Sequence, residues 1–248
     1  MSSNERIVIG LETQIPYHST KVFQAFLRFL KDYKPTRLIC IGDFLDAPAP
    51  ARWNRGTAAE YAGNLQAECN VGKGMLAEIR KVYDGPFGYH TSANHEARIN
   101  NYARTKAPAF ADLEALRVKN LLDLDHFEID ELPTINHLTP SVVTTHGDTG
   151  SLSKYGGGTA IGVARRLGKN VICGHTHRHG IIHERFGPKT IFGMETGHMM
   201  DVKKATYIRD GAPNWSAGWG VLEIKGENVQ PITVTCSRNG NASLYVPA

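Results

Sequence analysis

An α/β fold with parallel strands is the class that this sequence predicts, and three features of the chain point to it. Residues 5–12 form a short apolar run rich in β-branched side chains, which is typical of a buried strand. Residues 18–33 place apolar side chains at helical spacing, with Ser19 or Thr20 as N-cap, before Pro35. Residues 37–43 form a second apolar run. A strand, a helix and a strand within about 40 residues predict a βαβ unit, whose two strands run in the same direction.

Composition narrows the class of protein. The 248 residues are 41% hydrophobic and 21% charged, which is ordinary for a globular protein and sufficient for a single domain, 1–248, with a sizeable core. No apolar run approaches the ~18 residues of a membrane span, and the N-terminus carries no signal-peptide pattern. We therefore expect a cytoplasmic protein. The net charge of +4 permits a polyanionic partner without requiring one, because the basic residues are scattered along the sequence.

The cysteines indicate an intracellular protein without disulfides. All four are widely spaced and none belongs to a Cys-x-x-Cys pair: Cys40, Cys69, Cys173 and Cys236. Cys40 and Cys173 lie inside apolar, strand-like runs. We therefore expect buried, reduced thiols rather than a disulfide framework.

Further elements follow from periodicity and from glycine and proline breaks. Helical segments are predicted over 57–82 with glycines near its middle, over 96–124 with an interruption near Pro108, and over 156–168 after a glycine loop. Strands are predicted at 85–96 before a loop, as an antiparallel pair over 127–138, at 141–148, at 170–177, and repeatedly through the tail 181–248.

Polar side chains gather just past the ends of successive predicted strands. They are Glu12, Gln14, Asp43, Asp46, Asn94, His95, His146, His175 and His177. Any one of them is explained by ordinary turn chemistry or by a structural hydrogen bond. Five such junctions in strand order instead predict one shared site, because ligands of open α/β sheets bind at the carboxyl ends of the strands.

The side chains in this set suit metal ions. Asp, Asn and His offer oxygen and nitrogen donors that fit Mn, Fe, Zn, Ni or Co, and no cysteine lies among them, which argues against a structural thiolate zinc site. Asp43 could bridge two ions through its two carboxylate oxygens, while His175 and His177 could each face one of them. The pattern predicts a two-metal site, in which ions ~3.5–4 Å apart activate a water and clamp a phosphoryl group.

The series of motifs resembles that of the calcineurin-like metallophosphoesterases. The motifs are GDFLD at 42–46, ANHE at 93–96, THGD at 145–148 and GHTH at 174–177, and the match spans roughly residues 7–180. NWSAGWGVLEI at 214–224 is further similar to a branch frequent in bacteriophages, for which the host cytoplasm is the expected location. The resemblance implies a four-layer α/β/β/α sandwich with two mixed β-sheets and the metals at the sheet edge.

The resemblance also implies a role for each ligand. Asp43 would bridge two divalent metal ions, Asn94, His146 and His175 would complete the second metal, and Glu12, Gln14 and His177 would fall at the first. Asp43 and Asn94 would thereby belong to the catalytic set together with His95.

The resemblance assigns further residues around the metals. His95 would lie beside the substrate phosphate, as proton donor to the leaving oxygen or as a positive clamp. Asp46 and Glu96 resemble carboxylates that orient ligand histidines. Arg98 and Arg178 either meet phosphate oxygens or belong to the solvated surface.

Two positions depart from the family pattern. Ala93 stands where the family has Gly, which asks for a backbone outside the glycine-only region. Glu12-Thr13-Gln14 replaces Asp-x-His, so a neutral amide oxygen stands where an imidazole is usual. We expect the first metal to bind less tightly or exchange faster, and to favour Mn²⁺ or Mg²⁺ over Zn²⁺, with Mn²⁺ the leading candidate.

These observations predict a metal-dependent phosphoesterase, and a phosphodiesterase rather than a monoesterase. A metal-activated water would attack phosphorus, because the chain carries neither a P-loop nor a nucleophile elbow. A small phosphodiester or nucleotide is favoured over duplex DNA, since the aromatics Trp53, Tyr102 and Tyr155 are isolated in the sequence. Two alternatives stay open: a nuclease acting on DNA or RNA, and a catalytically weak metal- or nucleotide-binding protein that holds only the second metal. Oligomeric state is not indicated.

Overall fold

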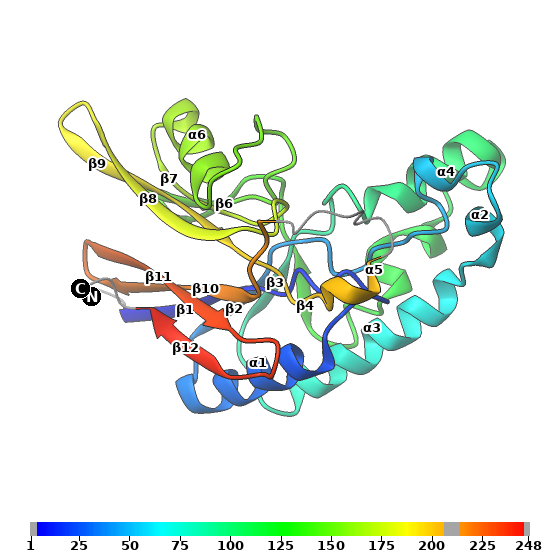
Figure 1. Cartoon of the computed structure of the whole chain (residues 1–248), viewed down its shortest axis with the longest axis horizontal. Helices are drawn as coiled ribbons and strands as arrows, with labels where there is room; N and C mark the ends of the chain where they lie inside the picture. Colours follow the sequence, from blue (N-terminus) through cyan, green and yellow to red (C-terminus); the bar gives the residue numbers. More distant parts are fainter. Residues whose placement is uncertain (1–3, 206–213, 246–248) are drawn as a thin grey trace.

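Two mixed β-sheets packed face to face form the centre of the protein, whose computed structural model describes residues 4–205 and 214–245 (Figure 1). The seven-stranded sheet has the order β12 (Ala242–Tyr245), β11 (Asn228–Cys236), β10 (Gly218–Lys225), β1 (Asn4–Gly10), β2 (Arg37–Cys40), β3 (Phe87–Tyr89), β4 (Ile129–Glu131). The five-stranded sheet has the order β5 (Asn136–Thr139), β6 (Val142–Thr144), β7 (Asn170–Cys173), β9 (Lys189–Thr196), β8 (His179–Phe186).

Helices cover both outer faces of this sandwich (Figure 1). On the seven-stranded side lie α1 (Thr20–Tyr33) and α3 (Leu65–Arg80), and on the five-stranded side lies α6 (Gly158–Leu167). A lobe beside the sheets carries α2 (Ala58–Ala62), α4 (Ala97–Lys106) and α5 (Val118–Leu121). Short 3₁₀ turns complete the chain at Arg52–Asn54, Pro108–Phe110, Glu114–Leu116 and Val202–Lys204. The predicted four-layer α/β/β/α architecture with two mixed sheets is confirmed.

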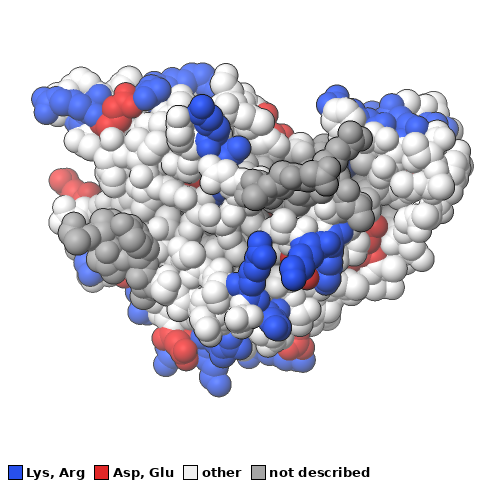
Figure 2. Space-filling model, in the orientation of Figure 1, with Lys and Arg blue, Asp and Glu red and all other residues white. Residues whose placement is uncertain are grey.

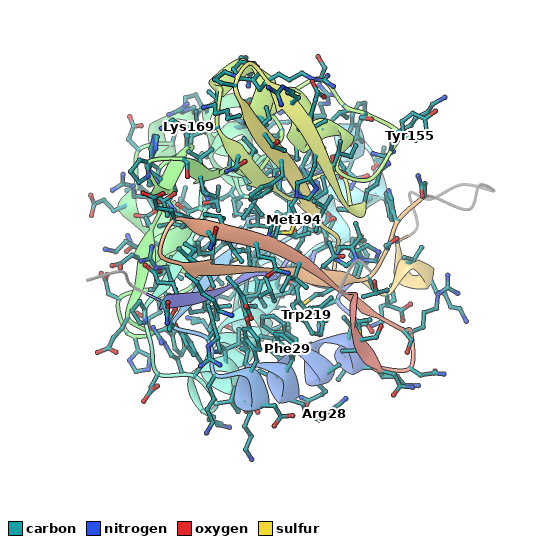
Figure 3. All side chains as sticks on the ribbon, turned by 90° about the vertical axis from the view of Figure 1, so that its left-hand side faces the viewer. Arg28, Phe29, Tyr155, Lys169, Met194 and Trp219 are labelled. Atoms are coloured by element: carbon teal, nitrogen blue, oxygen red, sulfur yellow. The ribbon has the colours of Figure 1, made fainter. Side chains whose placement is uncertain are left out.

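The buried core has three layers: one between the two sheets, one between the seven-stranded sheet and its helices, and one between the five-stranded sheet and α6. Ile7 and Ile9 of β1 face the inter-sheet layer with Met194 of β9, while Val8 faces the helices. Figure 3 shows Met194 between the sheets and Trp219 beside Phe29 of α1; the ring centroids of Trp219 and Phe29 are 5.2 Å apart. A strand buried on both faces must be apolar at every position, which explains the continuous run in β1.

The predicted βαβ unit is confirmed, since β1 and β2 are parallel neighbours joined through α1. Ser19 is the N-cap, with its Oγ accepting from the backbone N–H of Val22 at 3.4 Å. The helix ends at Lys34, which adopts a left-handed backbone before Pro35. The four cysteines are free and buried, as expected.

The predicted helix over 57–82 is in fact two helices, and the break falls at Gly63 and Asn64 rather than at the glycines in the middle. The Asn64 side chain caps α3 by accepting from the N–H of Ala67 at 3.0 Å. Gly72 lies within α3 and packs closely against Leu122, whose Cδ2 would lie 2.8 Å from an added Cβ. Beyond α4, the predicted helical stretch reduces to short turns and α5.

The predicted antiparallel pair over 127–138 is wrong. Its first strand, β4, runs parallel to β3, and its second strand, β5, pairs with β6 in the other sheet. Pro133 lies between them and cannot donate to a ladder, so the chain leaves one sheet here and enters the other. Among the described residues, none of the helices has the length and apolar character needed to cross a bilayer.

Candidate metal centre

The polar side chains that follow five strands converge at one edge of the sandwich. Two groups have donor atoms that all lie within 4.8 Å of one another: Asp43 with His146 and His175, and Asp43 with Glu12 and His177. Asp43 is common to both, and it lies at the end of β2 between the loops that follow β1 and β3. The geometry therefore offers two adjacent positions for a cation, with one shared carboxylate.

The backbone that carries these side chains is strained. Gln14, Asp43, His175 and His177 are all non-glycine residues in the left-handed region, with φ of 53°, 51°, 69° and 58°. L-residues rarely adopt this conformation, and such residues concentrate at functional sites. Glycine is required at position 42 of the Asp43 loop, because an added Cβ would lie 2.7 Å from the Nδ1 atom of His146.

Glu96 holds the loop that carries Asp43. Its carboxylate accepts from the backbone N–H groups of Asp43 at 3.1 Å, Phe44 at 2.8 Å and Leu45 at 3.2 Å, and from the Tyr89 hydroxyl at 2.6 Å. The expectation that Glu96 orients a ligand histidine is wrong, since its hydrogen bonds come from the backbone of the Asp43 loop and from the Tyr89 hydroxyl. Ala93 keeps a negative φ, so the substitution of the family glycine does not strain the backbone.

His146 is the best-fixed side chain of the second position. Its Nδ1 lies 3.0 Å from the carbonyl oxygen of Ile41, which fixes Nδ1 as the donor. Its Nε2 faces Oδ1 of Asn94 at 2.9 Å and Oδ1 of Asp43 at 3.2 Å. Both oxygens are acceptors, so Nε2 must either carry a second proton or share a cation with them.

The electrostatics of this position also favour a positive charge. Burial alone would lower the pKa of His146, but the neighbouring Asp43 carboxylate raises it to about 10. The pKa of Asp43 is in turn far below its ordinary range, because the imidazoles of His146 and His95 outweigh its burial. His175 completes the position, with an Nδ1 that is buried and has no hydrogen-bond partner among the described residues. A divalent cation fits these donors.

The first position is organised differently. The amide nitrogen of Gln14 donates to Oδ2 of Asp43 at 3.1 Å and lies 3.1 Å from Nε2 of His177. That Nε2 also lies 3.0 Å from Oε1 of Glu12, and the Gln14 carbonyl oxygen is buried with no partner among the described residues. A half-turn of the amide would point this oxygen at Oδ2 of Asp43 and Nε2 of His177, where a cation could bind all three atoms. Glu12, Gln14 and His177 thus fit a cation once the amide turns.

His95 lies between Asp43 and a second carboxylate. Its backbone N–H donates to Oδ1 of Asp43 at 3.2 Å, and its Nδ1 lies 3.4 Å from Oδ2 of Asp46. Arg98 donates to its Nε2 at 2.8 Å and to Oδ1 of Asp46 at 3.0 Å. Burial lowers the pKa of His95, but the carboxylates of Asp43 and Asp46 raise it by more than burial lowers it, so the net shift of the pKa is upward. Asp46 orients His95, and Arg98 competes with a proton for Nε2.

A cavity of about 760 Å³ opens beside these residues. Trp53, Arg98, Leu152 and Arg178 are among the residues that line it. Figure 2 shows a notch at the top of the molecule, beside the lobe that carries α4. Trp215 also lines the cavity, with its ring centroid 4.3 Å from that of His177. Sequence reasoning missed Trp215 as a site residue, although it lies in the stretch 214–224 that carries the phage-type resemblance.

The three aromatics expected to be isolated have separate environments. Trp53 is 71% exposed at the cavity, and Tyr155 is 64% exposed and points outward in Figure 3. Tyr102 is half-buried and donates its hydroxyl proton to Glu60 at 2.9 Å.

Two mycobacteriophage proteins are similar to this chain over nearly its whole length. The Gene 54 protein of Mycobacterium phage D29 is 36% identical over 236 residues, and that of Mycobacterium phage L5 is 35% identical over 236 residues, with 92% of each chain covered. The chain belongs to this family of phage proteins. No family model matches it.

The solved structures with a similar fold include two forms of one protein type. Vacuolar Protein Sorting 29 of Cryptosporidium parvum has a TM-score of 0.53 at 13% identity, covering 98% of this chain and 96% of the other. Vps29 of Entamoeba histolytica in complex with zinc has a TM-score of 0.51 at 12% identity, covering 97% of both. This likeness confirms the calcineurin-like metallophosphoesterase fold, and the phage relatives fit its predicted phage branch.

Proposed function

We propose that this protein is a metal-dependent phosphodiesterase whose centre holds two divalent ions. The observation that carries the proposal is the pair of donor groups that share Asp43 at the carboxyl edge of the strands. A zinc complex of Vps29, which has the same fold, supports the ability of this architecture to hold a divalent ion.

The residues would divide between the two positions as the sequence motifs predict. Asn94, His146 and His175 would hold the second ion, Glu12, Gln14 and His177 the first, and Asp43 both. Bound ions, Mn²⁺ foremost, would supply an activated water and neutralise charge on the phosphoryl oxygens. The protein's own residues would position the ester and manage the proton of the leaving group.

His95 would act as the general acid, and Arg98 would control whether Nε2 of His95 can carry a proton. In the observed arrangement Arg98 donates to Nε2 of His95, so the lone pair of this nitrogen accepts a hydrogen bond and Nε2 is unprotonated. A phosphate oxygen in the cavity would draw Arg98 away, since guanidinium groups bind phosphate through paired donors. Nε2 could then take a proton, favoured by Asp43 and Asp46, and pass it to the leaving oxygen.

A diester suits the cavity better than a monoester. Trp53 and Trp215 line its walls, so apolar surface is available to substituents on more than one side of the phosphorus. Arg178 also lines the cavity, and its Nε is buried without a hydrogen-bond partner among the described residues, which leaves a donor for a phosphate oxygen.

The second candidate function is that of a weak enzyme or a binding protein that holds one ion. It is favoured by the Gln14 amide, whose nitrogen donates to Asp43 and lies beside Nε2 of His177, because a cation at the first position would have to displace these contacts. The two candidates predict different metal dependences.

The test is a Mn²⁺ titration of bis-p-nitrophenyl phosphate hydrolysis, with the wild type beside Gln14→His. We expect saturable activity in the wild type and a half-saturating Mn²⁺ concentration roughly tenfold lower in the variant, because imidazole is the stronger ligand. Asp43→Ala serves as the inactive control. Activity in the variant alone would favour the binding protein, and activity in the Asp43→Ala control would refute the site.

A further inference from the structure

A second cavity, of about 590 Å³, adjoins the candidate metal centre and is rich in arginine. Four arginines line it: Arg52, Arg55, Arg98 and Arg104. They come from the turn before α2 and from α4, two segments far apart in the sequence that the fold places side by side (Figure 1). Figure 2 shows Lys and Arg side chains gathered along the top of the lobe that carries α4.

Three of these arginines have no carboxylate partner in the part of the chain that the structure describes. Arg52, Arg55 and Arg104 are exposed, and within residues 4–205 and 214–245 none of them forms an ion pair with a carboxylate. Lys106, on the same helix α4 as Arg104, differs from them because it pairs with Glu60 at 3.3 Å. Several unpaired cations around one cavity create a positive potential that attracts a polyanion.

The arginine cavity lies next to the proposed catalytic cavity. Arg98 and Trp53 line both cavities. Asn94 lines the arginine cavity and also places its Oδ1 2.9 Å from Nε2 of His146. A substrate phosphate at the metal centre would therefore have further phosphate-binding groups directly beside it.

Trp53 marks the boundary between the two cavities. Its side chain is 71% exposed, and the Arg52 guanidinium lies over its ring at 4.0 Å. An exposed indole beside arginines is the arrangement by which proteins stack unpaired bases while neutralising the strand. A base-paired duplex keeps its base faces covered and could not use this ring.

We propose that the arginine cavity binds the phosphate backbone of a single-stranded nucleic acid, with Trp53 stacking a base next to the phosphodiester at the metal centre. This inference rests on the proposed phosphodiesterase function and names its substrate class. A small cyclic nucleotide has one phosphate and would leave Arg52, Arg55 and Arg104 without an anion. Arg98 and Arg104 of α4 thus come together in space with Arg52, Trp53 and Arg55, more than 40 residues earlier in the sequence.

The test is fluorescence anisotropy with labelled oligodeoxythymidylate and oligouridylate, in EDTA so that no turnover consumes the probe, over a series of salt concentrations. We expect Arg55→Gln/Arg104→Gln to weaken binding of both probes and to reduce the slope of log Kd against log salt by about 1.4, or about 0.7 for each lost phosphate contact. The matched control is Arg166→Gln/Arg185→Gln, two exposed arginines of α6 and β8 that should leave both quantities unchanged.

Trp53 provides an independent arm of the same experiment. Trp53→Ala should weaken single-strand binding roughly tenfold or more, and Trp53→Phe should restore most of it, because stacking needs an aromatic face. A duplex of equal length should bind less tightly than the single strand.

Several outcomes would overturn the inference: equal losses in the two arginine pairs, an unchanged salt slope, or tighter binding of the duplex. Hydrolysis of bis-p-nitrophenyl phosphate without oligonucleotide binding would refute it and leave the proposed function intact. Oligonucleotide binding without any hydrolysis would support the arginine site and refute the proposed function.

Discussion

The two candidate metal positions share Asp43 but differ in what holds their other side chains. At the second position, the Ile41 carbonyl fixes Nδ1 of His146, so that Nε2 meets the oxygens of Asn94 and Asp43. At the first position, the Gln14 amide donates to Asp43 and contacts His177. At the second position, Nε2 of His146 faces two acceptor oxygens, so a proton or a cation must lie between them. At the first position, the Gln14 amide N–H already supplies a donor.

This difference teaches that ligand identity alone does not set the affinity of a site. The imidazole-to-amide exchange in the opening motif weakens the ligand, and the same amide also supplies hydrogen bonds that a cation must displace. Both effects act in the same direction. We therefore expect ordered binding, in which the second position fills at a lower metal concentration than the first.

The largest expected effect comes from removing one histidine from each position in turn. His146→Ala should lower turnover by at least about a thousandfold, because it empties the position that holds charge most strongly. His177→Ala should mainly raise the required Mn²⁺ concentration, by roughly tenfold. The measurement is calorimetric Mn²⁺ titration together with the rate of diester hydrolysis.

Circular dichroism controls for folding in this pair, since both side chains are buried. The comparison fails if the two variants lose the same class of Mn²⁺ site, or if His177→Ala is the more damaging of the two.

A smaller effect is expected from His95, which contacts Asp43 but belongs to neither group of donors. His95→Asn should slow hydrolysis of a diester with an alkyl leaving group about 10²-fold, the lower end of what general acid catalysis contributes. The loss should be much smaller for a p-nitrophenyl ester, whose leaving group needs no proton. Equal losses on both esters would instead assign His95 to phosphate binding.

The pH profile of the wild type sharpens this assignment. Burial lowers the pKa of His95, but the carboxylates of Asp43 and Asp46 outweigh burial and raise this pKa above 6.5. An acid must be protonated to act, so activity on the alkyl ester should persist above pH 6.5 and fall only at higher pH. Arg98→Gln should move this alkaline limb to still higher pH, because Arg98 lowers the pKa of His95.

Sequence patterns predicted those parts of the site that are local. Each motif at 42–46, 93–96, 145–148 and 174–177 follows a buried strand, and strand ends are visible as apolar runs that stop at glycine and polar residues. The fold then needs only parallel neighbours to bring the motifs together, and the βαβ signal supplied that expectation.

Contacts between distant segments were not predictable in the same way. Residues 129–131 and 136–139 look like partners because they are adjacent, yet each pairs with a strand from elsewhere. Glu96 adjoins His95 in sequence, but it lies at the start of α4, where its carboxylate accepts hydrogen bonds from the backbone of the Asp43 loop. Trp53 and Trp215 share a cavity only after folding. Periodicity reports which face of an element is buried, and says nothing of what lies across from it.

The smallest expected effect concerns a carboxylate that touches neither metal position. Burial and the nearby Asp46 carboxylate raise the pKa of Glu68 from 4.5 to about 7. A carboxyl that binds its proton more tightly when folded stabilises the protein at low pH and loses that contribution as pH rises from about 4.5 to about 7. Glu68→Gln is neutral at every pH, so it should stabilise the fold only in the upper part of this range and above.

The gain should be about 1 kcal/mol above pH 7, once solvent screening is allowed for, and near zero at about pH 4. Thermal unfolding at the two pH values would register it as a rise of roughly 2–4 °C at the higher pH alone. The exposed Glu227→Gln is the matched control and should change neither value. Glu68→Gln should also leave the Mn²⁺ affinity of both metal positions unaltered. A changed affinity at either position would mean that the metal centre extends through Asp46 into α3. The metal centre could then no longer be described as two positions joined only by Asp43.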